Sequence, residues 1–124
     1  MRAGENVPLK QRVTFGKFQN IDLRVAQIKS APPAEGTTYP CRLITLDAGH
    51  LGNFISVAQL ALVPEEQLRG RKVVICANLG PREIGQYESE VLVMGVPHPD
   101  SPADEDQAYP LFVDDLAVVG DPIY

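Results

Sequence analysis

Apolar and polar side chains alternate from Ile21 to Val25, with the period of two that is typical of a β-strand with one solvent-facing side. The alternation then slips, because Ile28 follows Val25 at an odd spacing. One extra residue near Ala26–Gln27 would restore it. We therefore predict a strand over 21–28, with a β-bulge that lets the strand bend.

Four further stretches are rich in apolar and β-branched residues and end in turn residues, so they are expected to be strands: 41–46, 52–57, 72–77 and 90–94. The last two lack alternation, which predicts strands buried on both faces. Pro64, two acidic residues and a later Gly70 predict a helix of one or two turns over 64–68. A last strand, broken by two aspartates, is expected over 111–119.

Five core strands with one short helix between the third and the fourth are the element order of an OB-fold, a small Greek-key barrel that binds oligonucleotides. A chain of 124 residues also has the size of one domain. We therefore predict an all-β, five-stranded OB-fold barrel that occupies residues 1–124 as a single domain. Its core is expected at about 15–95, with an N-terminal extension, an acidic Pro-rich loop at 96–110 and a C-terminal strand region at 111–124.

The formal net charge of −5 argues against a nucleic-acid ligand, because binding to phosphates requires Lys and Arg side chains. The acidic residues are unevenly placed, however. Residues 96–110 hold four of them and no Lys or Arg, which leaves 11 basic against 12 acidic side chains elsewhere. The folded body therefore has room for a modest basic face, and the acidic loop is expected to be exposed and mobile.

Cys41 and Cys76 each lie within an apolar run, so buried free thiols are expected in preference to a zinc site or a disulfide. His50 and His98 are too far apart in the chain for a conventional zinc site. No metal or other cofactor is expected. No apolar run reaches the ~18–20 residues that span a bilayer, and the N-terminus has no signal-peptide pattern. We therefore expect a soluble, cytoplasmic protein without membrane insertion.

The sequence contains no recognisable catalytic or phosphate-binding motif. Its four serines stand outside any G-x-S-x-G motif, and only two distant histidines accompany them. The two Gly-rich segments, 49–52 and 80–85, are too short for a phosphate-binding loop and lack a following Gly-Lys-Ser/Thr. We therefore expect these segments to be turns, and we expect no catalytic residues.

The segment 78–90 joins two predicted buried strands and carries polar side chains suited to a ligand face. Arg82 can contact a phosphate through two hydrogen bonds or stack on a base. Asn78 and Ser89 can hydrogen-bond to sugar or base edges. The alternative is structural: Asn78 caps the turn, and Ser89 with Glu90 only begins the next strand.

Two basic groups are further candidates for phosphate contacts. The denser group follows the predicted helix, at Arg69, Arg71 and Lys72. The structural alternative is that these basic side chains lie in solvent at the C-terminal end of the helix and interact favourably with the helix dipole. The second group combines basic and aromatic residues near the N-terminus: Lys10, Arg12, Phe15, Lys17 and Phe18. Such a group can form a stacking platform, or its aromatics can anchor a short helical turn to the core.

Four ordered stretches of the chain resemble the tRNA-binding domain family: Phe18–Ile28 (F-Q-N-I-D-L-R-V-A-Q-I), Tyr39–Gly49 (Y-P-C-R-L-I-T-L-D-A-G), Ser56–Leu60 (S-V-A-Q-L) and Lys72–Gly95, which includes N-L-G-P-R and S-E-V-L-V-M-G. That family is an OB-fold module that occurs alone or appended to some methionyl- and phenylalanyl-tRNA synthetases. Within it, the sequence is most similar to the CsaA-type proteins, described as protein-export chaperones.

The resemblance implies a homodimer whose contact is built by the segments flanking the barrel, and recognition of tRNA by shape and backbone. The positions that match the family's binding loop are Asn78, Arg82, Ser89 and Glu90. The chain departs from the family where Glu83 replaces a second basic residue and where Ala26 replaces a glycine. These departures weaken phosphate binding and leave the fold untouched.

Three hypotheses of function follow. The first is a non-catalytic, homodimeric tRNA-binding protein of the CsaA type. The alternative is a peptide-binding chaperone whose partners are unfolded export-substrate polypeptides. The third is a purely structural dimer, because a fold does not fix a function. A positive groove around Arg82 would favour the first hypothesis, and a neutral, apolar groove would favour the second.

Overall fold

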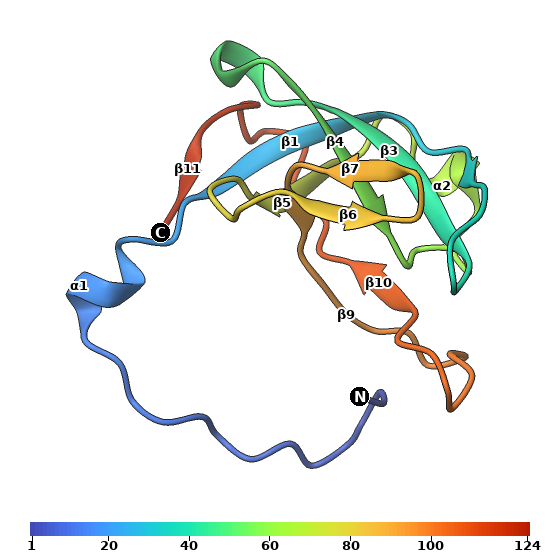
Figure 1. Cartoon of the computed structure of the whole chain (residues 1–124). Helices are drawn as coiled ribbons and strands as arrows, with labels where there is room; N and C mark the ends of the chain where they lie inside the picture. Colours follow the sequence, from blue (N-terminus) through green and yellow to red (C-terminus); the bar gives the residue numbers. More distant parts are fainter.

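The computed structural model describes residues 1–124, and its body is a small antiparallel β-barrel (Figure 1). Five strands form most of the barrel wall: β1 (Leu23–Ser30), β3 (Cys41–Asp47), β4 (Asn53–Ala58), β5 (Lys72–Cys76) and β8 (Leu92–Val93). In the sheet, β3 and β5 flank β1, while β4 pairs with β3 and β8 pairs with β5. The two-residue strand β2 (Pro33–Ala34) pairs with β3. This all-β, OB-like arrangement confirms the fold class predicted from the sequence.

Strand β1 joins two parts of the barrel. It pairs with β5 over Leu23–Gln27 and with β3 from Gln27 onward. The register shifts between Ile28 and Ser30, so the prediction of a bulge at Ala26–Gln27 is wrong in position. The pairing with β5 stays regular through Gln27, and Ala26 lies fully buried inside the barrel.

The barrel interior is a single apolar cluster of 13 buried residues, with members from β1, β3, β5 and β8, and Phe54 and Ala58 of β4 pack against it. The short helix α2 (Glu65–Leu68) lies between β4 and β5 along the chain, as predicted, and adds the buried Leu68 to this cluster. The Glu65 carboxylate accepts the Ala31 N–H at 3.0 Å and pairs with Arg69 at 3.2 Å. These two contacts, the first being the larger, lower the pKa of Glu65.

The C-terminal part of the chain departs from the predicted strand over 111–119. Within that range only Phe112 forms a β-bridge, to Val73. The Asp114 carboxylate accepts the N–H of the residue two positions later, which closes a turn and ends any extended run. The last strand, β11 (Pro122–Ile123), comes later and pairs with the start of β1.

A glycine contact holds this C-terminal segment against the barrel. The 3-10 turn η1 (Gly49–Leu51) connects β3 to β4 and begins with Gly49 at a φ of +63°. A Cβ at this position would lie 2.6 Å from the carbonyl oxygen of Val119, so only glycine allows the close approach. The neighbouring Gly120 N–H donates to the Val25 carbonyl oxygen, which continues the attachment.

The stretch 96–110 is tied to the body at both ends. Strands β9 (Gly95–Pro97) and β10 (Ala108–Pro110) pair with each other, and only the segment between them forms the acidic tip. The buried Gln107 side chain accepts the Ala61 N–H at 3.1 Å and donates to the Pro40 carbonyl at 2.9 Å. The region predicted to be a loop is therefore a β-hairpin, and the Gln107 side chain, at the base of its acidic tip, hydrogen-bonds it to the body.

The N-terminal helix α1 (Phe15–Phe18) is a single turn, capped by the Thr14 hydroxyl, which accepts the Lys17 N–H. Its two phenylalanine rings lie 6.4 Å apart, and both are exposed. The expectation that these aromatics anchor the turn to the core is therefore wrong. Residues 1–14 form an extended arm that leaves α1 and arcs away from the barrel (Figure 1).

Candidate functional site

The segment expected to be a polar loop between two buried strands contains a β-hairpin, here named the Arg82 hairpin. Its strands are β6 (Arg82–Ile84) and β7 (Tyr87–Ser89), joined by a two-residue turn. The turn begins with Gly85 at a φ of +60°, a conformation that glycine adopts without strain. The Tyr87 hydroxyl accepts the Glu35 N–H at 3.1 Å, which links the hairpin to the loop between β1 and β3.

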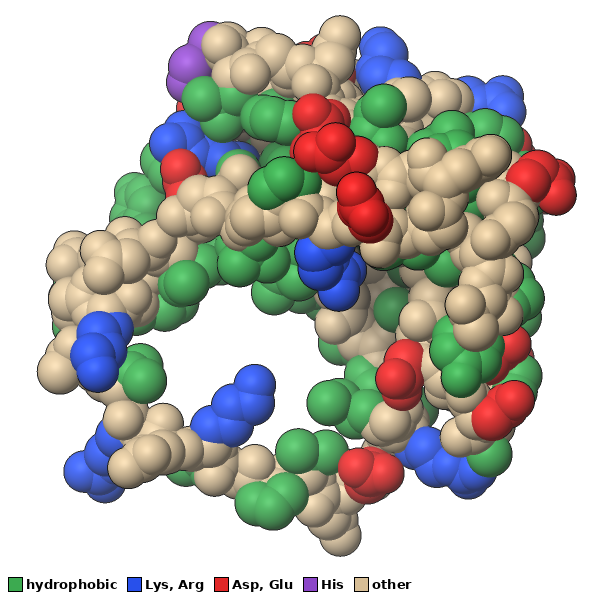
Figure 2. Space-filling model, in the orientation of Figure 1, with side chains coloured by type: hydrophobic (Ala, Val, Ile, Leu, Met, Phe, Trp, Pro, Cys, Tyr) green, Lys and Arg blue, Asp and Glu red, His purple; other side chains and the backbone are tan.

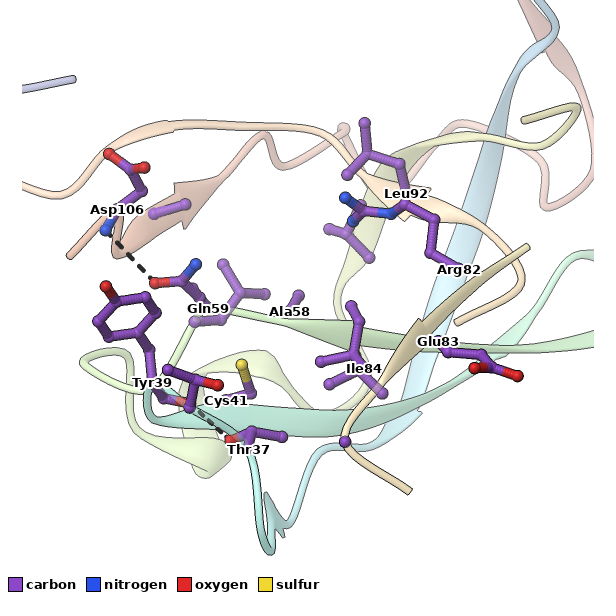
Figure 3. A pocket seen from close by; sticks show the side chains of 16 residues that line it. Thr37, Tyr39, Cys41, Ala58, Gln59, Arg82, Glu83, Ile84, Leu92 and Asp106 are labelled. Carbon is purple, nitrogen blue, oxygen red and sulfur yellow. Dashed lines mark hydrogen bonds between the residues drawn. The ribbon is translucent and has the colours of Figure 1, made fainter. Parts of the chain in front are cut away.

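A cleft of about 470 Å³ lies beside this hairpin, between β6, the end of β4 and the start of β3 (Figure 3). We name it the Arg82 cleft. Its labelled lining residues are Thr37, Tyr39, Cys41, Ala58, Gln59, Arg82, Glu83, Ile84, Leu92 and Asp106. Because these residues come from distant parts of the sequence, the cleft exists only in the folded chain.

Alternation along β6 decides which side chains face the cleft. Successive residues of a strand point to opposite faces, so Arg82 and Ile84 share a side. Figure 3 shows Ile84 pointing into the middle of the cleft and Glu83 pointing away from it. Glu83 lies opposite Glu88 across the hairpin, on the outer face. Glu83, which stands where the family has a second basic residue, therefore holds its negative charge on the side away from Arg82.

The far rim of the cleft is polar but has no free cation. Tyr39 is partly exposed there, and the Asp106 N–H donates to the Gln59 side-chain oxygen at 3.3 Å (Figure 3). Arg82 stands at one end of the cleft and the Asp106 carboxylate borders the other. The lining is thus mostly apolar, with one positive and one negative charge facing it.

One edge of β6 is unpaired. The strand β6 forms its ladder with β7 only, and no backbone hydrogen bond reaches its outer edge. An unpaired strand edge presents N–H and C=O groups that can pair with an added extended chain. Because β6 also lines the cleft, its free edge lies beside the apolar part of the lining. We call this part the floor; it is formed by Val57, Ala58, Leu60, Ile84, Leu92 and Val93.

Both cysteines are free and buried, as predicted. Cys41 lies at the cleft, and burial raises the pKa of its thiol, with a hydrogen bond from Thr37 opposing the shift. The thiol therefore stays protonated at neutral pH, and a protonated thiol is a poor nucleophile. In this cleft Cys41 contributes apolar surface.

Ser89 and Glu90 close the barrel. The Ser89 hydroxyl accepts the Val57 N–H at 3.0 Å, and the Glu90 carboxylate accepts the Ile55 N–H at 2.8 Å. Both donors belong to β4, which forms a strand ladder only with β3. Together with the backbone bond from the Glu90 N–H to the Ile55 carbonyl, at 2.8 Å, the two side chains take the place of a strand ladder at the seam of the barrel. Ser89 is 5% exposed, and its contact lies inside the wall rather than in the cleft.

Asn78 lies at a different place from Arg82. Its side-chain oxygen accepts the Asp22 N–H at 2.9 Å, and its amide nitrogen donates to the Asn20 carbonyl at 2.7 Å. It therefore fastens the segment between α1 and β1 to the end of β5. Asn78 borders a second cleft of about 590 Å³, which is lined by α1 and by the C-terminal Tyr124.

The basic cluster after α2 is engaged within the protein. Arg69 pairs with Glu65, and Lys72 donates to two carbonyl oxygens of the C-terminal segment at 2.6 and 2.7 Å. The Arg71 guanidinium lies 3.7 Å from the ring centroid of Phe112, in a cation–π contact. Of the residues predicted to bind nucleic acid, Arg82 alone both lines the cleft and lacks a partner within the chain.

The distribution of charge divides the chain in two. Residues 1–20 hold four basic side chains and one acidic, whereas residues 21–124 hold seven basic and fifteen acidic. Most basic side chains of the body have partners: Arg42, for instance, donates to three backbone carbonyls. In the body, only Lys29 and Arg82 make no ion pair, hydrogen bond or cation–π contact.

Sequence reasoning missed the residues that complete the cleft, chiefly Tyr39, Ile84 and Asp106. Ile84 carried a usable signal, because it alternates with Arg82 and stands directly before a turn glycine. The other two lie far from Arg82 in the chain and carried none.

No group of three or more His, Cys, Asp or Glu side chains gathers where it could hold a metal ion. None of the helices has the length and apolar character of a membrane span.

No family model matches the chain. Among solved structures, the CsaA chaperone protein of Picrophilus torridus superposes with a TM-score of 0.79 at 27% identity, covering 91% of this chain and 100% of that one. The chaperone CsaA of Bacillus anthracis gives 0.79 at 25% identity, over 92% and 100%. A MetRS-related protein of Pyrococcus horikoshii gives 0.79 at 21% identity, over 93% and 100%, and shares the fold. The chain is thus similar to CsaA-type chaperones over nearly its whole length.

Proposed function

We propose that this chain is a non-catalytic binding protein of the CsaA type that holds an extended segment of unfolded polypeptide in the Arg82 cleft. The observation that carries this proposal is the free edge of β6 beside an apolar floor. An extended peptide can pair its backbone with such an edge while alternate side chains enter the pocket. The similarity to two structures named as CsaA chaperones supports the same function.

Charge supports a polypeptide ligand over a polyanion for this cleft. The cleft faces one arginine and one aspartate, and the surrounding body carries an excess of acid. Affinity for a polyanion grows with the number of phosphates that Lys and Arg neutralise, and the lining of this cleft offers one such side chain. The criterion of a neutral, apolar groove, set out from the sequence, therefore favours the chaperone hypothesis here.

A homodimer is part of this proposal. The face formed by α1 and the C-terminus leaves several large apolar side chains exposed, among them Phe15, Phe18 and Tyr124. These residues border the 590 Å³ cleft, which no other part of the chain covers. A second copy that packs there would bury this surface, and exposed apolar patches commonly mark such contacts. Light scattering after size-exclusion chromatography tests it, and a solitary subunit at micromolar concentration would reject it.

Fluorescence anisotropy tests the cleft with a labelled nonapeptide that alternates Leu with Ser. Ile84→Asp places a charge on the apolar floor, and Tyr39→Ala removes the rim aromatic. We expect each to weaken binding about tenfold, which corresponds to about 1.4 kcal/mol. The matched control is Leu116→Asp, since Leu116 is 91% exposed and does not line the cleft. Equal affinity in all variants would reject the proposed function.

A tRNA-binding role is the second candidate, favoured by the unpartnered Arg82 at the mouth of the cleft. Binding of bulk tRNA is measured at low and near-physiological salt. Each phosphate contact contributes roughly 0.7–0.9 to the slope of log affinity against log salt concentration. If Arg82 makes such a contact, Arg82→Ala lowers the slope by that amount. An unchanged slope, or no tRNA binding at low salt, rejects this candidate.

A further inference from the structure

The N-terminal arm, residues 1–14, is exposed along its whole length. The one hydrogen bond that joins it to the body runs from the Met1 amino group to the Asp106 carboxylate, at 2.9 Å. Residues 8–13 make no backbone hydrogen bond at all. In Figure 2 the arm stands off the body around an open space, with basic side chains along it. An extended segment with unpaired backbone is therefore presented to the solvent.

The side chains of the arm have the pattern of a strand with two different faces. Val7, Leu9 and Val13 fall on one side at a period of two, and Lys10 and Arg12 fall on the other. Leu9 is 97% exposed and Val13 is 68% exposed. A single exposed leucine is ordinary, but a row of apolar side chains on an unpaired extended segment lacks the surface that it would pack against.

The Arg82 cleft offers the complement of this pattern. Its floor is apolar, and one edge of β6 is unpaired. The acidic tip between β9 and β10, residues 98–107, holds four carboxylates and no basic side chain. Asp106 of this tip lines the cleft itself. A segment that is apolar on one side and basic on the other thus matches both the cleft and its border.

We propose that the arm of one copy docks in the Arg82 cleft of a second copy, extended beside β6, with Val7 and Leu9 toward the floor and the basic side chains toward the acidic tip. In its own chain the arm begins beside Asp106, which lines the cleft, and runs from there to α1 in an arc that stands off the barrel (Figure 1). The inference rests on the proposed function, because it gives the peptide cleft an occupant from the same protein. The docked arm then competes with an unfolded polypeptide for the cleft.

The direct test uses a fluorescein-labelled peptide with the sequence of residues 6–14, NVPLKQRVT, and the full-length chain carrying Leu9→Asp, whose own arms cannot dock. We expect the peptide to bind in anisotropy measurements. The same peptide with Asp at the Leu9 position is expected not to bind. The unchanged peptide is expected to bind about tenfold more weakly to a Leu9→Asp chain that also carries Tyr39→Ala. If the arm peptide fails to bind while the Leu/Ser peptide binds, the inference is overturned and the proposed function stands. If neither peptide binds, the proposed function is rejected, and the inference that rests on it is rejected with it.

Competition supplies the second test. When the parent chain is present at a total concentration of about twice the dissociation constant of its arm, roughly half of the arms are docked, and they raise the apparent dissociation constant of the Leu/Ser peptide about twofold. Leu9→Asp is expected to remove this effect, and the exposed control Leu116→Asp is expected to keep it. Equal affinity in the parent and in Leu9→Asp at all concentrations would overturn the inference.

A photo-crosslinker in place of Leu9 shows where the arm lies. In an equal mixture of ¹⁵N-labelled and unlabelled chains, we expect crosslinks to Tyr39 or Ile84 with about half of the crosslinked pairs of mixed mass. Crosslinks confined to one chain, or to surfaces outside the cleft, would overturn the inference.

Discussion

Replacing Ser89 by alanine tests whether the barrel is closed by side chains. In the structure the Ser89 hydroxyl is the acceptor for the Val57 N–H, at 3.0 Å, and Val57 is 3% exposed. The alanine variant leaves this N–H buried without an acceptor, which costs about 1–3 kcal/mol. The second bond of the hydroxyl, to the Val91 carbonyl, is long at 3.4 Å and adds little. We expect a total loss of about 2 kcal/mol.

Urea denaturation followed by circular dichroism measures this loss. With a slope of roughly 2 kcal/mol per molar urea, the midpoint should fall by about 1 M. The thermal midpoint should fall by about 6–10 °C. Protein concentration is held constant between variants, because self-association would otherwise shift the midpoints.

The matched comparison is Glu90→Ala, which removes the other closing side chain. Its partner, the Ile55 N–H, lies on a residue that is 38% exposed, so water can replace the lost acceptor. We expect the Glu90 variant to lose less than about 1 kcal/mol. If the free energy of unfolding of Ser89→Ala lies within about 0.5 kcal/mol of the parent value, the Ser89 side chain does not help to close the barrel. A role for Ser89 at the surface is then favoured instead.

Three further predictions concern the fastened hairpin, the C-terminal attachment and acid stability. Gln107→Ala removes one buried methylene group and three hydrogen bonds of the side-chain amide, so we expect a loss of about 2–4 kcal/mol in urea denaturation; a variant as stable as the parent would show that the β9–β10 hairpin is not held by this side chain. Gly49→Ala is expected to lower the thermal midpoint because its Cβ meets a backbone oxygen at 2.6 Å, whereas Gly16→Ala, with open space around it, should leave the midpoint within error. The lowered pKa of Glu65 makes its stabilisation complete above its unfolded pKa of about 4.3 and lost as the pH falls through the folded value. The parent should therefore lose more stability than Glu65→Gln between pH 5 and pH 2, and identical losses would contradict this assignment.

The strands that were predicted well are those whose signal is local. β3, β4 and β5 begin and end within one or two residues of the predicted ranges, because apolar, β-branched runs between turn residues favour strands wherever the chain places them. The helix at 65–68 follows from Pro64 and the two acidic residues after it. The order of these elements indicated a small β-barrel with the OB-fold as one candidate, and the resemblance to the tRNA-binding domain family completed the prediction.

The errors arose where tertiary contacts outweigh the local pattern. The apolar run at 111–119 looks like a strand, but only its first residues bond to β5. An aspartate turn interrupts it after Val113, and the Asp115 and Ala117 carbonyls accept from the Lys72 side chain. The Arg82 hairpin was missed because its strands are three residues long and polar. Phe15 and Phe18 were expected to reach the core, and the short helix instead holds them outside it.

By itself the sequence determined the main strands, their order along the chain and the buried thiols, since each depends on residue types within a short window. It also directed attention to the region around Arg82. Only the tertiary structure decided what that region can bind. It engaged Asn78, Ser89 and Glu90 in hydrogen bonds that hold the barrel together, and it gave most body cations partners within the chain. It also brought Tyr39, Ile84 and Asp106 to one cleft from three distant segments. Such proximity depends on how the strands pair and curve, and no local window of sequence contains that information.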